Sequence, residues 1–184
     1  MKLKKTIRII AFFFFICFHL IFLTSILLDK LHHVWVIAGI VFISAIITYA
    51  YYHKSMDEED HFLEDLQDII YVVIGGVFTY FISNYLNLGS VIGAGLTGTL
   101  ASFAPAFIKN KPMKRFPVAC YCGAFVGMTA PNVAEGYSFI IFATFITGVF
   151  FSAAKNVFNG YGGKLGTIAF GGVAITSLLI YLFA

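Results

Sequence analysis

The chain has 184 residues, of which 60% are hydrophobic and only 11% are charged. Soluble domains carry about 25% charged residues, so this composition excludes a soluble globular domain and indicates a helical integral membrane protein. The net charge of +3 comes from basic residues spread over several segments, which excludes the basic stripe typical of nucleic-acid binding.

The long apolar stretches predict an all-α polytopic membrane protein with about seven transmembrane helices. A helix rises about 1.5 Å per residue, so a hydrocarbon core of about 30 Å needs about 20 residues. The N-terminal apolar run is too long for a signal peptide, and we expect it to remain as the first helix. In chain order, the predicted helices cover residues 7–28, 34–52, 69–86, 91–108, 116–130, 137–158 and 165–184.

The basic residues predict the orientation of these helices. With the N-terminus in the cytoplasm and seven passes, eleven of the twelve Lys and Arg residues face the cytoplasm, and Lys30 is the exception. This predicts an external C-terminus and a location in a bacterial cytoplasmic (inner) membrane. The segment 116–130 is short and bracketed by prolines, so a broken or tilted helix is expected there. A re-entrant loop would move Lys155 and Lys164 outside, which is the weaker interpretation.

Two parts of the chain resemble each other in sequence. The third and fourth predicted helices run in opposite directions to the sixth and seventh, so a repeat between them is inverted. Chance similarity between segments rich in Gly and Phe is the alternative. A genuine repeat divides one membrane domain, residues 1–184, into a first helix (1–30) and two three-helix units (31–108 and 109–184), a plan typical of secondary transporters. The matched residues include Gly76-Val77-Phe78 with Gly148-Val149-Phe150, Gly95 with Gly172, and Thr99 with Thr176.

Small and hydroxylated residues gather in the predicted helices that are interrupted by Gly and Pro. Close helix packing through small residues explains many of them. The alternative is a pathway, because irregular backbone at membrane depth is tolerated where it lines a cavity. An uncharged pathway favours an anion or a small neutral or polar solute. The pathway-lining candidates are Ser90, Gly93, Gly95, Thr97, Thr99, Ser102, Gly123, Gly127, Thr129, Asn132, Thr167, Gly171, Gly172 and Thr176.

An acidic cytoplasmic loop (residues 53–68) precedes the third predicted helix. A solvated helix start explains it, because acids are favoured near a helix N-terminus. The alternatives are a divalent-cation sensor or an electrostatic latch to the basic segment 109–115. The regulatory candidates are Asp57, Glu58, Glu59, Asp60, Glu64, Asp65 and Asp68.

No metal site, cofactor or enzymatic centre is expected. Cys120 and Cys122, with Met128, offer ligands for a soft metal ion, but side chains two residues apart point to different faces of a helix. Catalysis would need a nucleophile with a base, or several metal ligands, and the apolar stretches do not offer them.

The sequence therefore predicts a small membrane transporter or channel for an ion or small polar solute. Its expected partners are the lipid bilayer, its solute and further copies of itself through glycine faces. The alternative is a non-transporting accessory or assembly subunit that docks a cytoplasmic partner through the acidic loop.

Overall fold

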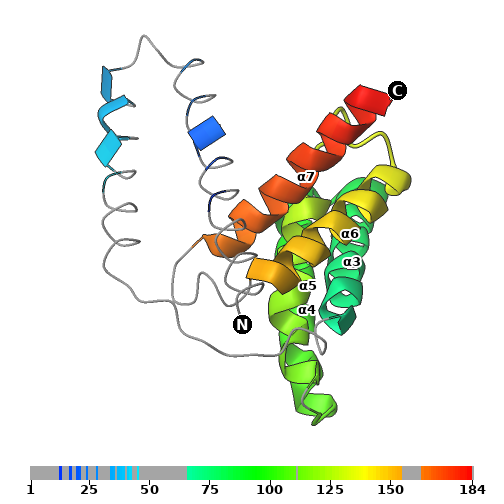
Figure 1. The fold of residues 1–184 in the computed structure, drawn as a ribbon. Helices are drawn as coiled ribbons and strands as arrows, with labels where there is room; N and C mark the ends of the chain where they lie inside the picture. The colour runs from blue at the N-terminus through cyan, green and yellow to red at the C-terminus, as the bar shows by residue number, and fades with distance from the viewer. Residues whose placement is uncertain are drawn as a thin grey trace.

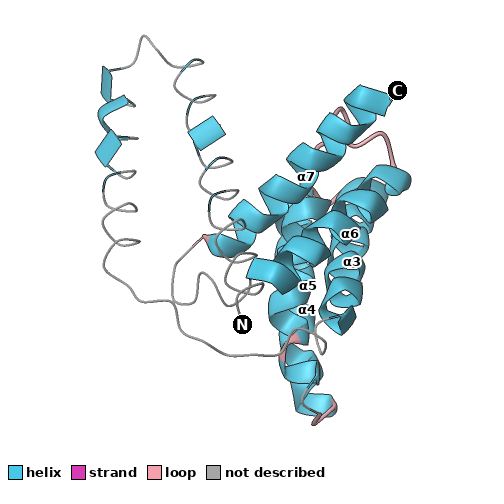
Figure 2. Ribbon diagram, viewed as in Figure 1, coloured by secondary structure: helices cyan, strands magenta, loops and turns pink. Residues whose placement is uncertain are grey.

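The computed structural model describes three long segments and a set of single positions nearer the N-terminus. The segments are residues 66–110, 112–154 and 163–183, and every regular element in them is helical (Figure 2). The single positions, also helical, are residues 13, 17, 20, 21, 24, 28, 34, 35, 37–39, 41, 42 and 45. The predicted helices 7–28 and 34–52 and the acidic residues 57–65 thus lie largely or wholly outside the described residues.

The described segments form five α-helices and two short helical turns (Figure 1). Each α-helix falls on one of the stretches expected from sequence, although α3 begins three residues before position 69. In chain order, the elements are α3 (Leu66–Tyr80), a π-helical turn (Phe81–Tyr85), α4 (Ser90–Phe107), a 3₁₀ turn (Pro112–Lys114), α5 (Phe116–Gly127), α6 (Tyr137–Ala154) and α7 (Lys164–Phe183).

Four of these helical stretches are long and apolar enough to cross a membrane. They are α3 with its π-helical turn, α4, α6 and α7, with 18 or 20 residues each. This indicates an integral membrane protein. α5 has only 12 residues, so its helix is about 18 Å long, which agrees with the short element expected there. The seven passes expected from sequence remain a prediction.

The local sequence explains where the helices start and stop. Asn87 and Gly89 adopt positive φ angles of 52° and 84°, and they form the turn that reverses the chain between α3 and α4. Gly and Asn are the residues that adopt this conformation most readily. Pro117 lies in the first turn of α5, where a missing backbone N–H breaks no helical hydrogen bond.

α5 lies at the centre of the described bundle and packs against α3, α4, α6 and α7 (Figure 1). Seven of its residues are buried, and most of them are small. Two apolar clusters lie along it: one contains Cys122 with Phe151 and Ile168, and the other contains Val126 with Ile140. The core therefore follows the shortest of the five described α-helices.

Glycines set the close approach of α3 and α5. A Cβ atom at Gly123 would collide with the backbone of Val72, and one at Gly75 would collide with the backbone of Cys120. Gly127 likewise faces the backbone of Gly76. Small residues allow membrane helices to pack backbone against backbone, so these glycines serve contacts within one chain.

α3 and α6 lie side by side and run in opposite directions. The Tyr80 hydroxyl, at the end of α3, donates to the Ala134 carbonyl 3.4 Å away, and the Tyr80 ring meets the Tyr137 ring edge-on at 5.2 Å. At the other end, Gly148 of α6 packs against Ile69 of α3. Antiparallel α3 and α6 agree with an inverted repeat, which itself remains a prediction.

Candidate functional site

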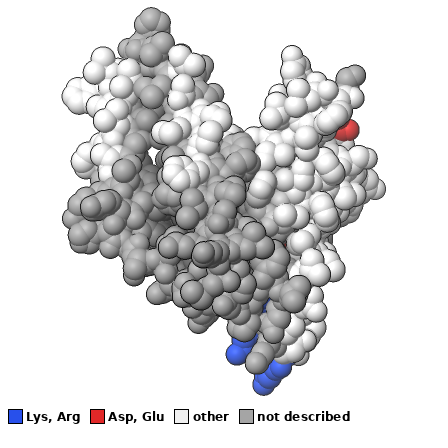
Figure 3. All heavy atoms as spheres, in the orientation of Figure 1, with Lys and Arg blue, Asp and Glu red and all other residues white. Residues whose placement is uncertain are grey.

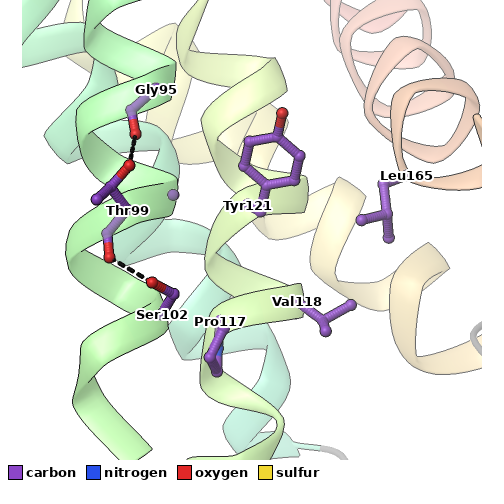
Figure 4. Close-up of a pocket in the computed structure, with 8 residues that line it drawn as sticks. Gly95, Thr99, Ser102, Pro117, Val118, Tyr121 and Leu165 are labelled. Carbon is purple, nitrogen blue, oxygen red and sulfur yellow. Dashed lines mark hydrogen bonds between the residues drawn. The ribbon is translucent and has the colours of Figure 1, made fainter.

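An open groove runs between α4, α5 and α7 (Figure 4). It has a volume of about 520 Å³. One wall comes from α4, the opposite wall from α5, and α7 contributes a single aliphatic side chain. The lining residues are Gly95, Gly98, Thr99, Ser102, Pro117, Val118, Tyr121 and Leu165.

The groove exists because α4 carries glycines on the face that it turns toward α5. No heavy atom lies within 4 Å of the position that a Cβ would take at Gly95. At Gly98 the Tyr121 ring fills this space, since a Cβ there would lie 2.8 Å from its Cδ2 atom. One glycine therefore leaves open space, and the other allows the Tyr121 ring to lie against α4.

Two hydroxyl groups on α4 give the groove its polar character. Thr99 Oγ1 donates to the Gly95 carbonyl at 2.8 Å, and Ser102 Oγ donates to the Thr99 carbonyl at 2.6 Å (Figure 4). Each hydroxyl hydrogen is thus directed at the helix backbone. The remaining lone pairs of these oxygens can accept hydrogen bonds or coordinate a cation.

The α5 wall is mainly apolar, with one phenol. Tyr121 projects from α5 into the space between α4 and Leu165 of α7 (Figure 4). Its ring packs against that of Phe125, with the centroids 4.8 Å apart. Because a phenol hydroxyl both donates and accepts, Tyr121 adds a hydrogen-bond donor to the acceptors of α4.

An ion pair joins α3 to the start of α5, just before the groove residue Pro117. Arg115 Nε lies 3.6 Å from Asp68 Oδ1, and the Asp68 side chain is fully buried whereas that of Arg115 is 30% exposed. Tyr71 and Phe116 meet edge-on beside this pair, with ring centroids 5.0 Å apart. The low dielectric of a buried site strengthens the attraction between the two charges.

Asp68 therefore differs from the solvated position expected from the sequence. It belongs to the first turn of α3 and is buried because α5 brings a cation to it. The pair joins Asp68 of the predicted acidic loop to Arg115 of segment 109–115. An electrostatic latch between these two segments would consist of such contacts. The other regulatory candidates, Asp57, Glu58, Glu59, Asp60, Glu64 and Asp65, lie outside the described residues.

The structure brings three of the pathway candidates together in the groove: Gly95, Thr99 and Ser102. Gly93 and Thr97 lie instead on the face of α4 that packs against α3. There Thr79 Oγ1 donates to Thr97 Oγ1 at 2.7 Å, and Thr97 Oγ1 donates to the Gly93 carbonyl at 2.8 Å.

The remaining candidates are distributed over other parts of the bundle. Gly123 and Gly127 pack against α3. Gly171, Gly172 and Thr176 are buried on α7, where Gly172 meets Thr147 of α6. The others lie at helix ends or in connections: Ser90 at the start of α4, Thr167 in the first turn of α7, and Thr129 and Asn132 between α5 and α6.

Sequence reasoning did not select five of the groove residues: Gly98, Pro117, Val118, Tyr121 and Leu165. Gly98 carries a sequence signal, since it continues the glycine series of α4. Pro117 is one of the prolines that bracket segment 116–130, which indicated a broken or tilted helix but not a lining residue. Val118, Tyr121 and Leu165 are apolar or aromatic residues of a kind that occurs throughout the chain, so no sequence signal distinguishes them.

The two cysteines of α5 lie on a continuous helix and are both buried. The Cys122 thiol donates to the Leu165 carbonyl of α7 at 3.6 Å. Within the described residues, no group of three or more His, Cys, Asp or Glu side chains has the geometry to hold a metal ion.

Comparison with known proteins identifies no relative: no family model, curated protein or solved structure matches this chain.

Proposed function

We propose that this protein is a small membrane transporter or channel, and that an ion or small polar solute moves along the groove between α4, α5 and α7. The observation that carries the proposal is the α4 wall of the groove. There a glycine leaves open space beside two hydroxyls, Thr99 and Ser102, in an otherwise apolar bundle. Polar groups that line an open space between membrane helices are typical of solute pathways.

The hydrogen bonds of the α4 wall favour a particular class of solute. Thr99 and Ser102 donate their hydrogens to backbone carbonyls, so they offer the solute only acceptor lone pairs. Among the lining residues, Tyr121 alone has a hydroxyl hydrogen that is not already donated to the backbone. This arrangement favours a monovalent cation, or a neutral solute that donates hydrogen bonds, over the anion considered from sequence.

The described helices agree with the part of the proposed orientation that concerns them, in which the connection between α4 and α5 faces the cytoplasm. α3 and α5 run in parallel, so Asp68 and Arg115 lie at the same end of the bundle. Glu135 follows α5 at the other end. The positive-inside rule assigns the end with Lys109, Lys114 and Arg115 to the cytoplasm.

The matched threonines of the proposed inverted repeat make the same hydrogen bond to the backbone four residues earlier, a bond that Thr97, Thr144 and Thr147 also make. Thr99 donates to the Gly95 carbonyl at 2.8 Å, and its sequence match Thr176 donates to the Gly172 carbonyl at 2.9 Å. The first pair lines the groove and the second is buried against α6. If the repeat is real, its two units have diverged: α4 lines the proposed pathway, whereas the matching helix α7 packs in the core.

Flux into liposomes that contain only this protein tests the proposal. The solute panel should include a monovalent cation, a small neutral polyol and a small anion. We expect Gly95→Phe to lower the flux of the transported solute at least about tenfold, because the ring fills the open space beside Thr99.

Leu96→Phe is the matched control. Leu96 is the next residue of α4, is 41% exposed and does not line the groove. We expect its flux to equal that of the wild type. Equal flux in both variants would exclude the groove as the pathway. Absence of flux for the whole panel, together with capture of a cytoplasmic partner through residues 57–65, would instead support the accessory-subunit alternative.

A further inference from the structure

The connection between α4 and α5 presents exposed basic side chains at one end of the molecule. Lys109 and Lys114 are both exposed, and Figure 3 shows basic atoms gathered at this end of the space-filling view. The acidic atoms visible in the same view lie at the opposite end. This end of the apolar bundle therefore carries a cluster of positive charges.

The described residues do not neutralise these two lysines. They contain two acids, Asp68 and Glu135. Asp68 is buried against Arg115, and Glu135 follows α5 at the other end of the bundle. Within the described part of the chain, no acidic side chain pairs with Lys109 or Lys114.

Local hydrogen bonds give the connection a defined shape. Asn110 Oδ1 accepts a hydrogen bond from the Met113 backbone N–H at 2.9 Å. The Arg115 N–H donates to the Pro112 carbonyl at 3.1 Å, which closes the 3₁₀ turn. These hydrogen bonds order Asn110 and residues 112–115, the described residues next to the two lysines, which lowers the entropic cost of binding.

Exposed apolar side chains next to the lysines place them at the depth of lipid headgroups. α4 ends at Phe107, which is 85% exposed, and Ile108 after it is 49% exposed. In a bilayer these side chains contact acyl chains. Lys109, one residue further on, then reaches the phosphate layer, as long basic side chains do at helix ends.

We infer that the connection between α4 and α5 binds the headgroups of anionic phospholipids, with the ammonium groups of Lys109 and Lys114 on the lipid phosphates. The inference does not depend on transport, since it rests only on this surface. An anionic lipid supplies the negative charge that the described residues lack here, and its acyl chains cover Phe107 and Ile108. Each basic residue at such a surface contributes about fivefold to the affinity for anionic lipid.

Thermal unfolding of the purified full-length protein in neutral detergent tests this inference. The protein is titrated with phosphatidylglycerol or with phosphatidylcholine of the same acyl chains. We expect phosphatidylglycerol to raise the Tm more than phosphatidylcholine does, because a ligand of the folded state stabilises it. Lys109→Gln combined with Lys114→Gln should lower the apparent affinity for phosphatidylglycerol about 30-fold.

The combined variant Lys109→Arg with Lys114→Arg is the charge-conserving control, and we expect it to keep the lipid preference. Equal effects of the two lipids on the wild type, or an unchanged affinity in the double Gln variant, would overturn the inference. A Tm shift of the same size with inorganic phosphate would show a site for free phosphate. The lipid preference could instead appear only after Asp57, Glu58, Glu59 and Asp60 are changed to amides. That result would show that the lysines pair with the acidic loop in the wild type, and it would overturn the inference.

Discussion

At the scale of single residues, the ion pair with Arg115 explains how a carboxylate can be buried in α3 just before its apolar sequence. An isolated carboxylate costs several kcal/mol to bury, so the burial of Asp68 in α3 would be unfavourable without a nearby cation. Arg115 supplies that cation from the residue that precedes α5. The pair therefore links α3 to the residue that precedes α5, far along the chain.

Changes at this pair should be strongly coupled. We expect Arg115→Gln to lower the free energy of unfolding by about 2–3 kcal/mol, less than for a fully buried pair because Arg115 is 30% exposed. Asp68→Asn in the same chain should recover part of this loss. Equilibrium unfolding in mixed micelles of the two single variants and the double variant gives the coupling energy, and strictly additive effects would contradict it.

The same pair shows what can be predicted from single residues. Hydropathy places the third helix at residue 69, since a charge at position 68 is unfavourable in an apolar segment. Asp68 is buried because of a contact with Arg115, and local sequence does not contain that contact. In the groove, Gly95, Thr99 and Ser102 could be predicted from sequence as small or hydroxylated residues. Tyr121 and Leu165 line it only because α5 and α7 pack near α4.

At the scale of helices, glycine has two different roles that sequence spacing does not separate. Gly123 packs backbone against backbone with α3, whereas Gly95 leaves open space on α4. Both belong to runs of small residues at similar spacing. Which role a glycine has depends on the face of its helix that meets a neighbour, and this is decided by tertiary packing.

Alanine substitutions should separate the glycines that make contacts from those that do not. Gly123→Ala places a methyl group against the Val72 backbone and should lower the free energy of unfolding by about 1–3 kcal/mol. Gly166→Ala is the control on α7, where no atom lies within 4 Å of the added Cβ. It should be neutral or stabilising by up to about 1 kcal/mol, since Ala favours helix over Gly.

The two variants are compared by unfolding in the same detergent mixture. Equal losses of stability would show that helix propensity, and not the crossing of α3 and α5, explains the effect at Gly123.

At the scale of the whole molecule, the order of the helices was accessible from sequence and their arrangement was not. Apolar stretches separated by short polar segments place all five described helices, with ends shifted by a few residues. The central position of α5 was not predictable, because its 12 residues are too few for it to count among the helices that could cross a membrane. Small side chains are what allow four neighbours to surround it.

The proposed topology is tested by labelling two ends of the bundle. In a variant with Cys17, Cys120 and Cys122 replaced, a cysteine introduced by Lys114→Cys or by Glu135→Cys lies at an exposed position. We expect a membrane-impermeant maleimide added to intact cells to label only the Glu135→Cys protein. Lys114→Cys should react only after the cells are permeabilised, and labelling of both positions from outside would contradict the orientation.

The short length of α5 has a consequence for the biogenesis of this protein. In the proposed topology, a helix of about 18 Å cannot cross a hydrocarbon core of about 30 Å without exposing the polar backbone at its ends to lipid. It becomes stable in the bilayer only when its neighbours cover those ends. Because α6 and α7 are synthesised after α5, the core around α5 cannot form until both of these helices have left the ribosome.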